Sequence, residues 1–160
     1  MEQQREKIIV FAGDSTTDAD KLSTPDLIGT GYVRLVRDSL TAFRPWESYR
    51  VFNAGVNGHT SRDLLRRWEK DVLSKAPDTV FCMIGINDVW HHYSFTYIET
   101  TDAEFEANLR LILTALRERT HARILLIQPV LLFGGTDEMR QELKRKQAIF
   151  ARLAETYADA

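Results

Sequence analysis

The chain contains four short apolar runs, in which hydrophobic residues follow one another instead of alternating with polar ones. They span residues 8–13, 51–56, 79–86 and 122–130. A strand has this pattern when helices cover both faces of its sheet, as happens in parallel sheets. The runs therefore predict four buried parallel strands.

Between and after these runs, hydrophobic residues recur at steps of three and four, which is the period of an amphipathic helix. Two helix starts carry a capping pair, Thr60 with Asp63 and Thr101 with Glu104, and the last helix opens near Asp137. We interpret the four stripes as the core-facing sides of helices. They are Val33, Val36, Leu40 and Phe43; Leu65, Trp68 and Val72; Phe105, Leu109, Ile112 and Leu116; and Met139, Leu143, Phe150, Leu153 and Tyr157.

Strands and helices alternate along the chain, from the first strand to the last helix. This order predicts a parallel sheet between helix layers, with right-handed crossovers. Residues 88–101, rich in aromatic side chains and histidine, are expected to form a loop at the carboxyl edge of the sheet, where open α/β sheets bind ligands. No repeat or linker interrupts the pattern, so residues 1–160 are predicted to be a single domain.

Composition narrows the class of protein. Hydrophobic residues make up 44% and charged residues 28%, as in an ordinary globular protein. A net charge of −2 gives no attraction toward nucleic acid or anionic lipid. The first apolar run is too short for a signal peptide or for a membrane span of ~20 residues. We expect a cytoplasmic protein that binds neither nucleic acid nor membrane, and we expect the single cysteine, Cys82, to be a core residue.

A serine follows the first predicted strand in the sequence Gly13-Asp14-Ser15. Gly13 permits a tight turn that would expose Ser15 at the carboxyl edge of the sheet. A hydroxyl at this place can act as a nucleophile if a base removes its proton. Taken alone, however, a motif of three residues fits a helix N-cap better than a nucleophile.

The second and third predicted strands also end in glycine and asparagine, near Gly58 and Asn87. Acyl transfer needs hydrogen-bond donors aimed at a developing oxyanion. The backbone N–H of Gly58, the side-chain amide of Asn87 and the N–H of Ser15 are suitable donors. Glycine and asparagine also simply make turns, but three such sites at neighbouring strand ends favour a functional site.

On these residues the chain resembles the SGNH, or GDSL-type, hydrolases. Ser15 in Gly-Asp-Ser matches the first block of that family, Gly58 the second, and Asn87 in Gly-Ile-Asn-Asp the third. Thr16 departs from the aliphatic residue that usually follows the serine. Within the family the chain looks most like the intracellular acetylxylan-esterase-like carbohydrate acetylesterases. The stretches that carry this narrower likeness are residues 29–33, 62–64, 67–69 and 83–90.

The resemblance implies a three-layer α/β/α, flavodoxin-like SGNH fold. It implies hydrolysis of small acyl esters, acetyl on carbohydrate above all, through an acyl-enzyme on Ser15, and a homo-oligomer. Ser15, Gly58 and Asn87 would form the oxyanion hole, Asp14 would order the turn, and Trp90 would line the acetyl pocket. No cofactor or metal is expected, since the family uses no metal and the sequence has no phosphate-binding loop and no metal-ligand spacing.

The family carries its catalytic aspartate and histidine as Asp-x-x-His after a fifth strand. No such motif follows Tyr157 in this sequence, so we expect an incomplete domain that lacks the final strand and helix, roughly 30–60 residues. A substitute base would have to reach the serine hydroxyl and be oriented by a third group. The sequence offers no evidence that His59, His91 or His92 meets both conditions.

A second interpretation is not enzymatic. The same fold could persist as a catalytically incomplete module that binds carbohydrate or forms oligomers. Trp90, Tyr93, Phe95 and Tyr97 would then form a sugar-stacking or subunit-contact surface. Aromatic side chains serve both purposes, so both interpretations remain open at this point.

Overall fold

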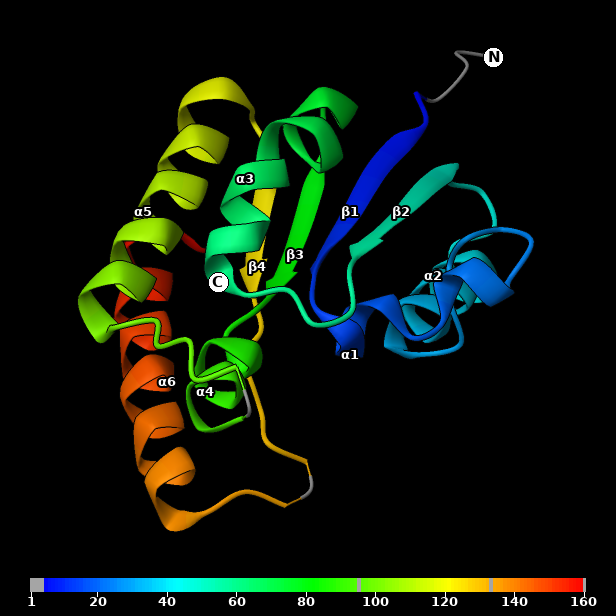
Figure 1. Ribbon diagram of the computed structural model, residues 1–160. Helices are drawn as coiled ribbons and strands as arrows, with labels where there is room; N and C mark the ends of the chain where they lie inside the picture. Colours follow the sequence, from blue (N-terminus) through cyan, green and yellow to red (C-terminus); the bar gives the residue numbers. More distant parts are fainter. Residues whose placement is uncertain (1–4, 95, 133, 160) are drawn as a thin grey trace.

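A parallel four-stranded sheet forms the centre of the molecule (Figure 1). The structure, a computed structural model, describes residues 5–94, 96–132 and 134–159. The order across the sheet is β2 (Tyr49–Gly55), β1 (Lys7–Gly13), β3 (Thr79–Met83) and β4 (Arg123–Leu126). Gly13 lies beside Gly55 on one side and Met83 on the other, so these strands end at a common edge. The four predicted parallel strands are confirmed.

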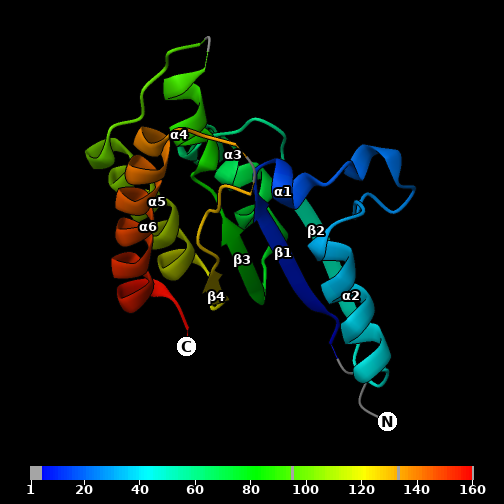
Figure 2. The ribbon, with the colours of Figure 1, turned by 90° about the horizontal axis from the view of Figure 1, so that it is seen from below.

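Helices cover both faces of the sheet, which gives the three layers expected of an α/β/α fold. Helices α3, α5 and α6 lie over one face and α2 over the other (Figures 1 and 2). Within the described part of the chain, no helix combines the length and apolar character needed to cross a bilayer. The helices are α1 (Ser15–Asp18), α2 (Tyr32–Phe43), α3 (Ser61–Asp71), α4 (Ile86–Tyr93), α5 (Asp102–Arg119) and α6 (Asp137–Tyr157), with single 3-10 turns at Lys21–Ser23 and Leu73–Lys75.

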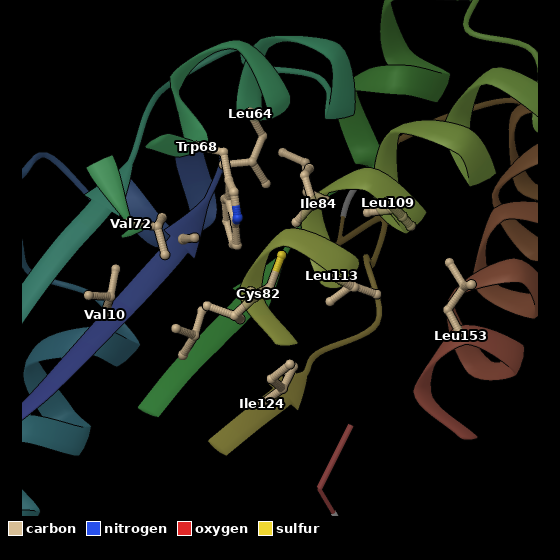
Figure 3. Close-up of a cluster of buried hydrophobic side chains, with 14 of the residues drawn as sticks. Val10, Leu64, Trp68, Val72, Cys82, Ile84, Leu109, Leu113, Ile124 and Leu153 are labelled. Atoms are coloured by element: carbon tan, nitrogen blue, oxygen red, sulfur yellow. The ribbon is translucent and has the colours of Figure 1, made fainter. Parts of the chain in front are cut away.

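The larger hydrophobic core lies between the sheet and helices α3, α5 and α6 (Figure 3). Val10, Trp68, Cys82 and Leu113 are buried there, and fully burying an aliphatic side chain such as that of Val10 or Leu113 contributes about 1.5–3 kcal/mol. Cys82 is 1% exposed, so it is a core residue, as predicted, and its burial raises the pKa of its thiol to about 12. A second cluster lies under α2, on the opposite face of the sheet.

The predicted capping residues begin the helices as expected. The Thr60 side chain accepts a hydrogen bond from the backbone N–H of Asp63 while the Asp63 carboxylate accepts one from the backbone N–H of Thr60, a complete capping box. Thr101 accepts from the N–H of Glu104 at 3.2 Å. Thr136 caps α6, next to the start predicted near Asp137.

The structure corrects three expectations. Residues 88–93 of the expected loop belong to helix α4, which begins at Ile86, the last residue of the third apolar run, because Gly85, at φ 129°, turns the chain from strand directly into helix. Strands β3 and β4 are shorter than their apolar runs. Ile84, beyond the end of β3, is fully buried, so it is apolar because it packs in the core and not because it pairs in the sheet. Phe43 is 79% exposed rather than core-facing.

The chain after α6 returns to the outer edge of the sheet. The backbone N–H of Asp159 donates to the Ile124 carbonyl at 2.8 Å, and the Asp159 carboxylate accepts from the Ile124 N–H at 2.6 Å. Both edge-facing backbone groups of Ile124 in β4 are therefore satisfied.

Candidate functional site

Ser15 is the first residue of α1, directly after β1 at the carboxyl edge of the sheet (Figure 1). A side chain at Gly13 would place its Cβ 2.2 Å from Thr17 Oγ1 and 2.5 Å from the Met83 carbonyl oxygen. Glycine is therefore required for α1 to pack this close to the sheet. The side chain of Ser15 is exposed, and within the described part of the chain its hydroxyl makes no hydrogen bond, so it is free to contact a ligand.

The Asp14 side chain makes a hydrogen bond within this turn. Its Oδ1 accepts a hydrogen bond from the Thr16 N–H at 3.0 Å, while its Oδ2 is buried without a partner among the described residues. Burial raises the pKa of the Asp14 carboxyl, and the nearby Asp88 carboxylate adds to this, although the hydrogen bonds from Thr16 oppose it. The turn therefore contains an acid that is costly to ionise.

Asn87 and the loop that contains Gly58 are joined by a hydrogen bond. The Asn87 Nδ2 donates to the carbonyl oxygen of His59, the residue after Gly58, at 3.0 Å. An amide nitrogen carries two N–H bonds, so the second one remains for a ligand. Gly58 has φ 77°, a conformation that favours glycine. Of the predicted oxyanion residues, Asn87 shares a cavity with Ser15, and Gly58 lies in the loop bonded to Asn87.

The buried carboxylate of Asp88 holds helix α4, which also carries Asn87, against its neighbours. Asp88 accepts from the Ser61 N–H at 2.9 Å and from the Ser61 Oγ at 2.6 Å. Asn108 on α5 donates in turn to Ser61 Oγ at 3.1 Å. Burial raises the pKa of Asp88, and the hydrogen bonds from Ser61 partly offset this. The network ties α4 to α3 and α5.

Two cavities of different character meet at Ser15. The smaller, about 260 Å³, includes the predicted pocket residue Trp90 and is lined largely by apolar side chains. The larger, about 550 Å³, is lined mainly by polar side chains. Besides Ser15, the smaller cavity is lined by Thr16, Ile86, Asn87, Trp90, Val130, Leu131 and Leu132. The larger is lined by Asp18, Ala19, Asp20, Leu22, Ser23 and Asn57.

The wall of the larger cavity is held in an unusual backbone conformation. Ala19 and Asp20 both have positive φ, at 43° and 56°, which costs about 1 kcal/mol or more for a residue with a side chain. Asn53 on β2 holds this segment, because its Nδ2 donates to the carbonyl oxygens of Thr17 at 2.7 Å and of Ile28 at 2.7 Å. Sequence reasoning missed Asn53, since it resembles an ordinary residue at a strand end.

No histidine ring is hydrogen-bonded to Ser15 in the part of the chain that the structure describes. His59 Nδ1 accepts from Arg67 Nε at 3.1 Å. His92 Nδ1 lies 2.9 Å from Glu142 Oε2. His121 lines a different cavity, together with Asp78 at the start of β3. A substitute base among these side chains is therefore not supported.

The second interpretation assigned four aromatic residues to one surface, and the structure describes three of them. Trp90 is 43% exposed, Tyr93 38% and Tyr97 78%. Phe95 lies outside the described residues. Trp90 borders the cavity beside Ser15, so at least this ring is in reach of a ligand there.

Two relatives match most of the chain. The acetylxylan esterase of Geobacillus stearothermophilus is 36% identical over 157 residues, which cover 92% of this chain and 71% of that protein. The uncharacterized protein YpmR of Bacillus subtilis strain 168 is 30% identical over 135 residues, or 77% of this chain and 51% of that protein.

Solved structures agree with these relatives. The crystal structure of the Geobacillus acetylxylan esterase superimposes with a TM-score of 0.86 at 34% identity and covers 98% of this chain and 75% of that one. Catalytic mutants of that esterase, with a serine, an aspartate or a histidine changed to alanine, have also been solved. An alpha/beta hydrolase enzyme from the metagenome of Lake Arreo, Spain, reaches 0.85 at 32% identity and covers 96% of this chain and 75% of that one.

The family assignment rests on a match that spans nearly all of the chain. Residues 11–160 match the GDSL-like Lipase/Acylhydrolase family, so the match includes Ser15, Gly58 and Asn87. The resemblance expected from the sequence is thereby confirmed. The chain belongs to the GDSL-like lipase/acylhydrolase family of carboxylic ester hydrolases, close to the acetylxylan esterases.

Proposed function

We propose that the chain is a serine esterase that removes a small acyl group, acetyl above all, from a carbohydrate. The observation that carries this proposal is the position of Ser15. Its exposed side chain lies at the carboxyl edge of the sheet, in one cavity with Asn87 and on the rim of a second, polar cavity. The names of the related esterases support an acetylated sugar as the substrate class.

In the proposed reaction, Ser15 Oγ attacks the ester carbonyl carbon and its proton passes to a base. The carbonyl oxygen becomes an oxyanion, which accepts hydrogen bonds from the N–H groups of Ser15 and Gly58 and from Asn87 Nδ2. The bond to the alcohol oxygen then breaks, and the alcohol leaves with a proton. Water repeats the attack on the acyl-enzyme, which releases the acid and restores Ser15.

The two cavities suit the two halves of such an ester. Ile86, Trp90 and Leu132 offer apolar contacts to a short acyl chain in the smaller cavity. Asp20 and Asn57 in the larger cavity offer an acceptor and an amide to the hydroxyls of a sugar. The acyl and alcohol groups of the ester would thus occupy different cavities beside Ser15.

The test is hydrolysis of p-nitrophenyl acetate and of an acetylated xylose by the chain and by Ser15→Ala. When a base takes the Ser15 proton, the rate should fall by at least a thousandfold, since removing the nucleophile of a serine hydrolase costs about 10⁶-fold in kcat. Without a base the serine contributes little, because nucleophile and base act as a unit. Ser74→Ala, an exposed serine that donates to the Lys70 carbonyl, is the matched control and should keep the full rate. Turnover that survives in Ser15→Ala would refute the proposal.

The non-enzymatic interpretation predicts a different pair of results. It is favoured by one observation, namely that no histidine ring is hydrogen-bonded to Ser15 among the described residues. A module that only binds would bind acetylated xylose with equal affinity in the unaltered chain and in Ser15→Ala, without turnover in either. Ser15-dependent release of acetate would exclude it.

A further inference from the structure

Arg67 on α3 makes a set of hydrogen bonds that the proposed reaction does not yet use. Its side chain is only 12% exposed. The Nη2 donates to the Gly13 carbonyl at 2.8 Å, and the Nη1 donates to the Ala54 carbonyl at 2.6 Å and to Asp71 Oδ2 at 3.1 Å. The Nε donates to His59 Nδ1 at 3.1 Å. Every nitrogen of the guanidinium is therefore engaged.

These partners lie in the loops that carry the proposed catalytic groups. The Gly13 carbonyl ends β1, two residues before Ser15, and the Ala54 carbonyl lies at the end of β2. His59 directly follows Gly58, and its carbonyl holds Asn87 Nδ2 at 3.0 Å. A single planar group thus joins the nucleophile turn and the Gly58 loop, and it reaches Asn87 through one further residue.

The bond from Arg67 also determines the state of the His59 ring. A guanidinium in a protein stays protonated and can only donate. Because Nδ1 of His59 accepts, it carries no proton, and the proton of the neutral ring is on Nε2. Burial and the positive charge of Arg67 lower the pKa of His59, which keeps the ring neutral near pH 7. The ring therefore serves to link Arg67 to the loop.

We propose that Arg67 is a positioning residue for ester hydrolysis, which sets the Gly58 N–H and the Asn87 amide relative to Ser15 through the His59 ring and the two strand-end carbonyls. This inference rests on the proposed esterase function. A lysine could not replace Arg67, because a single ammonium cannot reproduce the flat fork that spans Gly13, Ala54 and His59.

The kinetic test compares Arg67→Met and Arg67→Lys with Arg66→Met. Arg66 is the neighbouring residue on α3, but its side chain is 71% exposed, and among the described residues its ion pair is with Asp63, at 3.5 Å. Loss of one oxyanion donor costs about 10²–10³ in kcat, so misplaced donors should lower kcat by about 10–100-fold with KM changed less than about threefold. Arg67→Lys should not restore the rate, and Arg66→Met should match the unaltered chain. Thermal melts identify any variant that fails to fold. If Arg67→Met does not fold, Arg67→Lys, which keeps the positive charge, decides the test.

Nitrogen-15 NMR of His59 supplies a readout that general loss of stability would not change in the folded protein. We expect an unprotonated Nδ1 and a protonated Nε2 in the unaltered chain and in Arg66→Met. In folded Arg67 variants the two tautomers should mix, and the pKa of His59 should rise in Arg67→Met. An unchanged tautomer, or kcat within twofold of the unaltered chain, would overturn the inference. Absence of Ser15-dependent turnover in the unaltered chain would instead refute the esterase proposal, while the NMR result would still decide whether Arg67 sets His59.

Discussion

The carboxylate of Asp88 on α4 accepts two hydrogen bonds from Ser61, the first residue of α3, at 2.9 Å from its backbone nitrogen and 2.6 Å from its Oγ. Both residues are fully buried. Ser61 follows the Gly58 loop, and Asp88 follows Asn87, so this pair fixes the two proposed oxyanion elements to each other. The direction of the Asn87 amide therefore depends on the buried contact between Asp88 and Ser61.

We therefore expect Asp88→Ala to lower both stability and activity. The change leaves the Ser61 N–H and hydroxyl without their acceptor in a buried site, which costs about 2–4 kcal/mol of unfolding free energy for two lost partners. Urea unfolding measures this loss, and p-nitrophenyl acetate hydrolysis should show a lower kcat. Glu155→Ala, an exposed acid on α6, is the control and should change neither. A stability equal to that of the unaltered chain would contradict this account of Asp88.

The raised pKa of Asp14 predicts how the unfolding free energy depends on pH. Its pKa in the folded chain is raised by burial above the ordinary value of 3.8, so the folded state binds its proton more tightly than the unfolded state. This contribution favours folding below pH 3.8 and is lost as the pH rises through the folded pKa. Asp14→Asn keeps an oxygen for the Thr16 N–H and removes the titration. The unfolding free energy of the variant minus that of the unaltered chain should therefore increase from pH 4 to pH 7, and a difference that falls over this range would contradict the assignment.

Gly58 and Gly134 form a matched pair for testing the oxyanion loop. Both have positive φ, at 77° and 68°, and in both an added Cβ would meet no atom within 4 Å. Alanine at either position should therefore cost a similar conformational strain, about 1 kcal/mol. Only Gly58→Ala should also lower kcat for p-nitrophenyl acetate, because it displaces a proposed donor. Equal kcat in the two variants would count against Gly58 as a donor.

Trp90 should limit the length of the acyl chain. It lines the smaller cavity beside Ser15, so Trp90→Ala should enlarge the space for the acyl group. The ratio of kcat/KM for p-nitrophenyl butyrate to that for the acetate should rise by about tenfold, a change that corresponds to about 1.4 kcal/mol. Trp46→Ala, an exposed tryptophan between α2 and β2, should leave the ratio unchanged. An unchanged ratio in Trp90→Ala would show that the acyl group lies elsewhere.

The sequence was sufficient to predict the sheet and the four long helices, because continuous apolar runs and helical stripes are strong signals. It did not predict α4. That helix is only two turns long, and it follows β3 across Gly85, whose φ of 129° no pattern of neighbouring residues reveals. The aromatic residues near it were therefore interpreted as belonging to a loop.

The chemistry of their side chains singles out Ser15, Asn87 and Trp90 in the sequence, and the structure places these three residues around one cavity. Arg67 and Asp88 were missed as supporting residues, although both lie in stretches that carry the family resemblance. A charged residue on a helix is usually solvated, and only the packing of α3 against the strand ends shows that Arg67 points inward.

The most direct test of the proposed mechanism is to trap the acyl-enzyme. The chain is mixed with p-nitrophenyl acetate, quenched in acid during turnover, digested and analysed by mass spectrometry. The mechanism predicts an acetyl group on Ser15, formed in the unaltered chain and absent from Ser15→Ala. Turnover without an adduct on Ser15, or with the acetyl group on another residue whose replacement stops turnover, would contradict it.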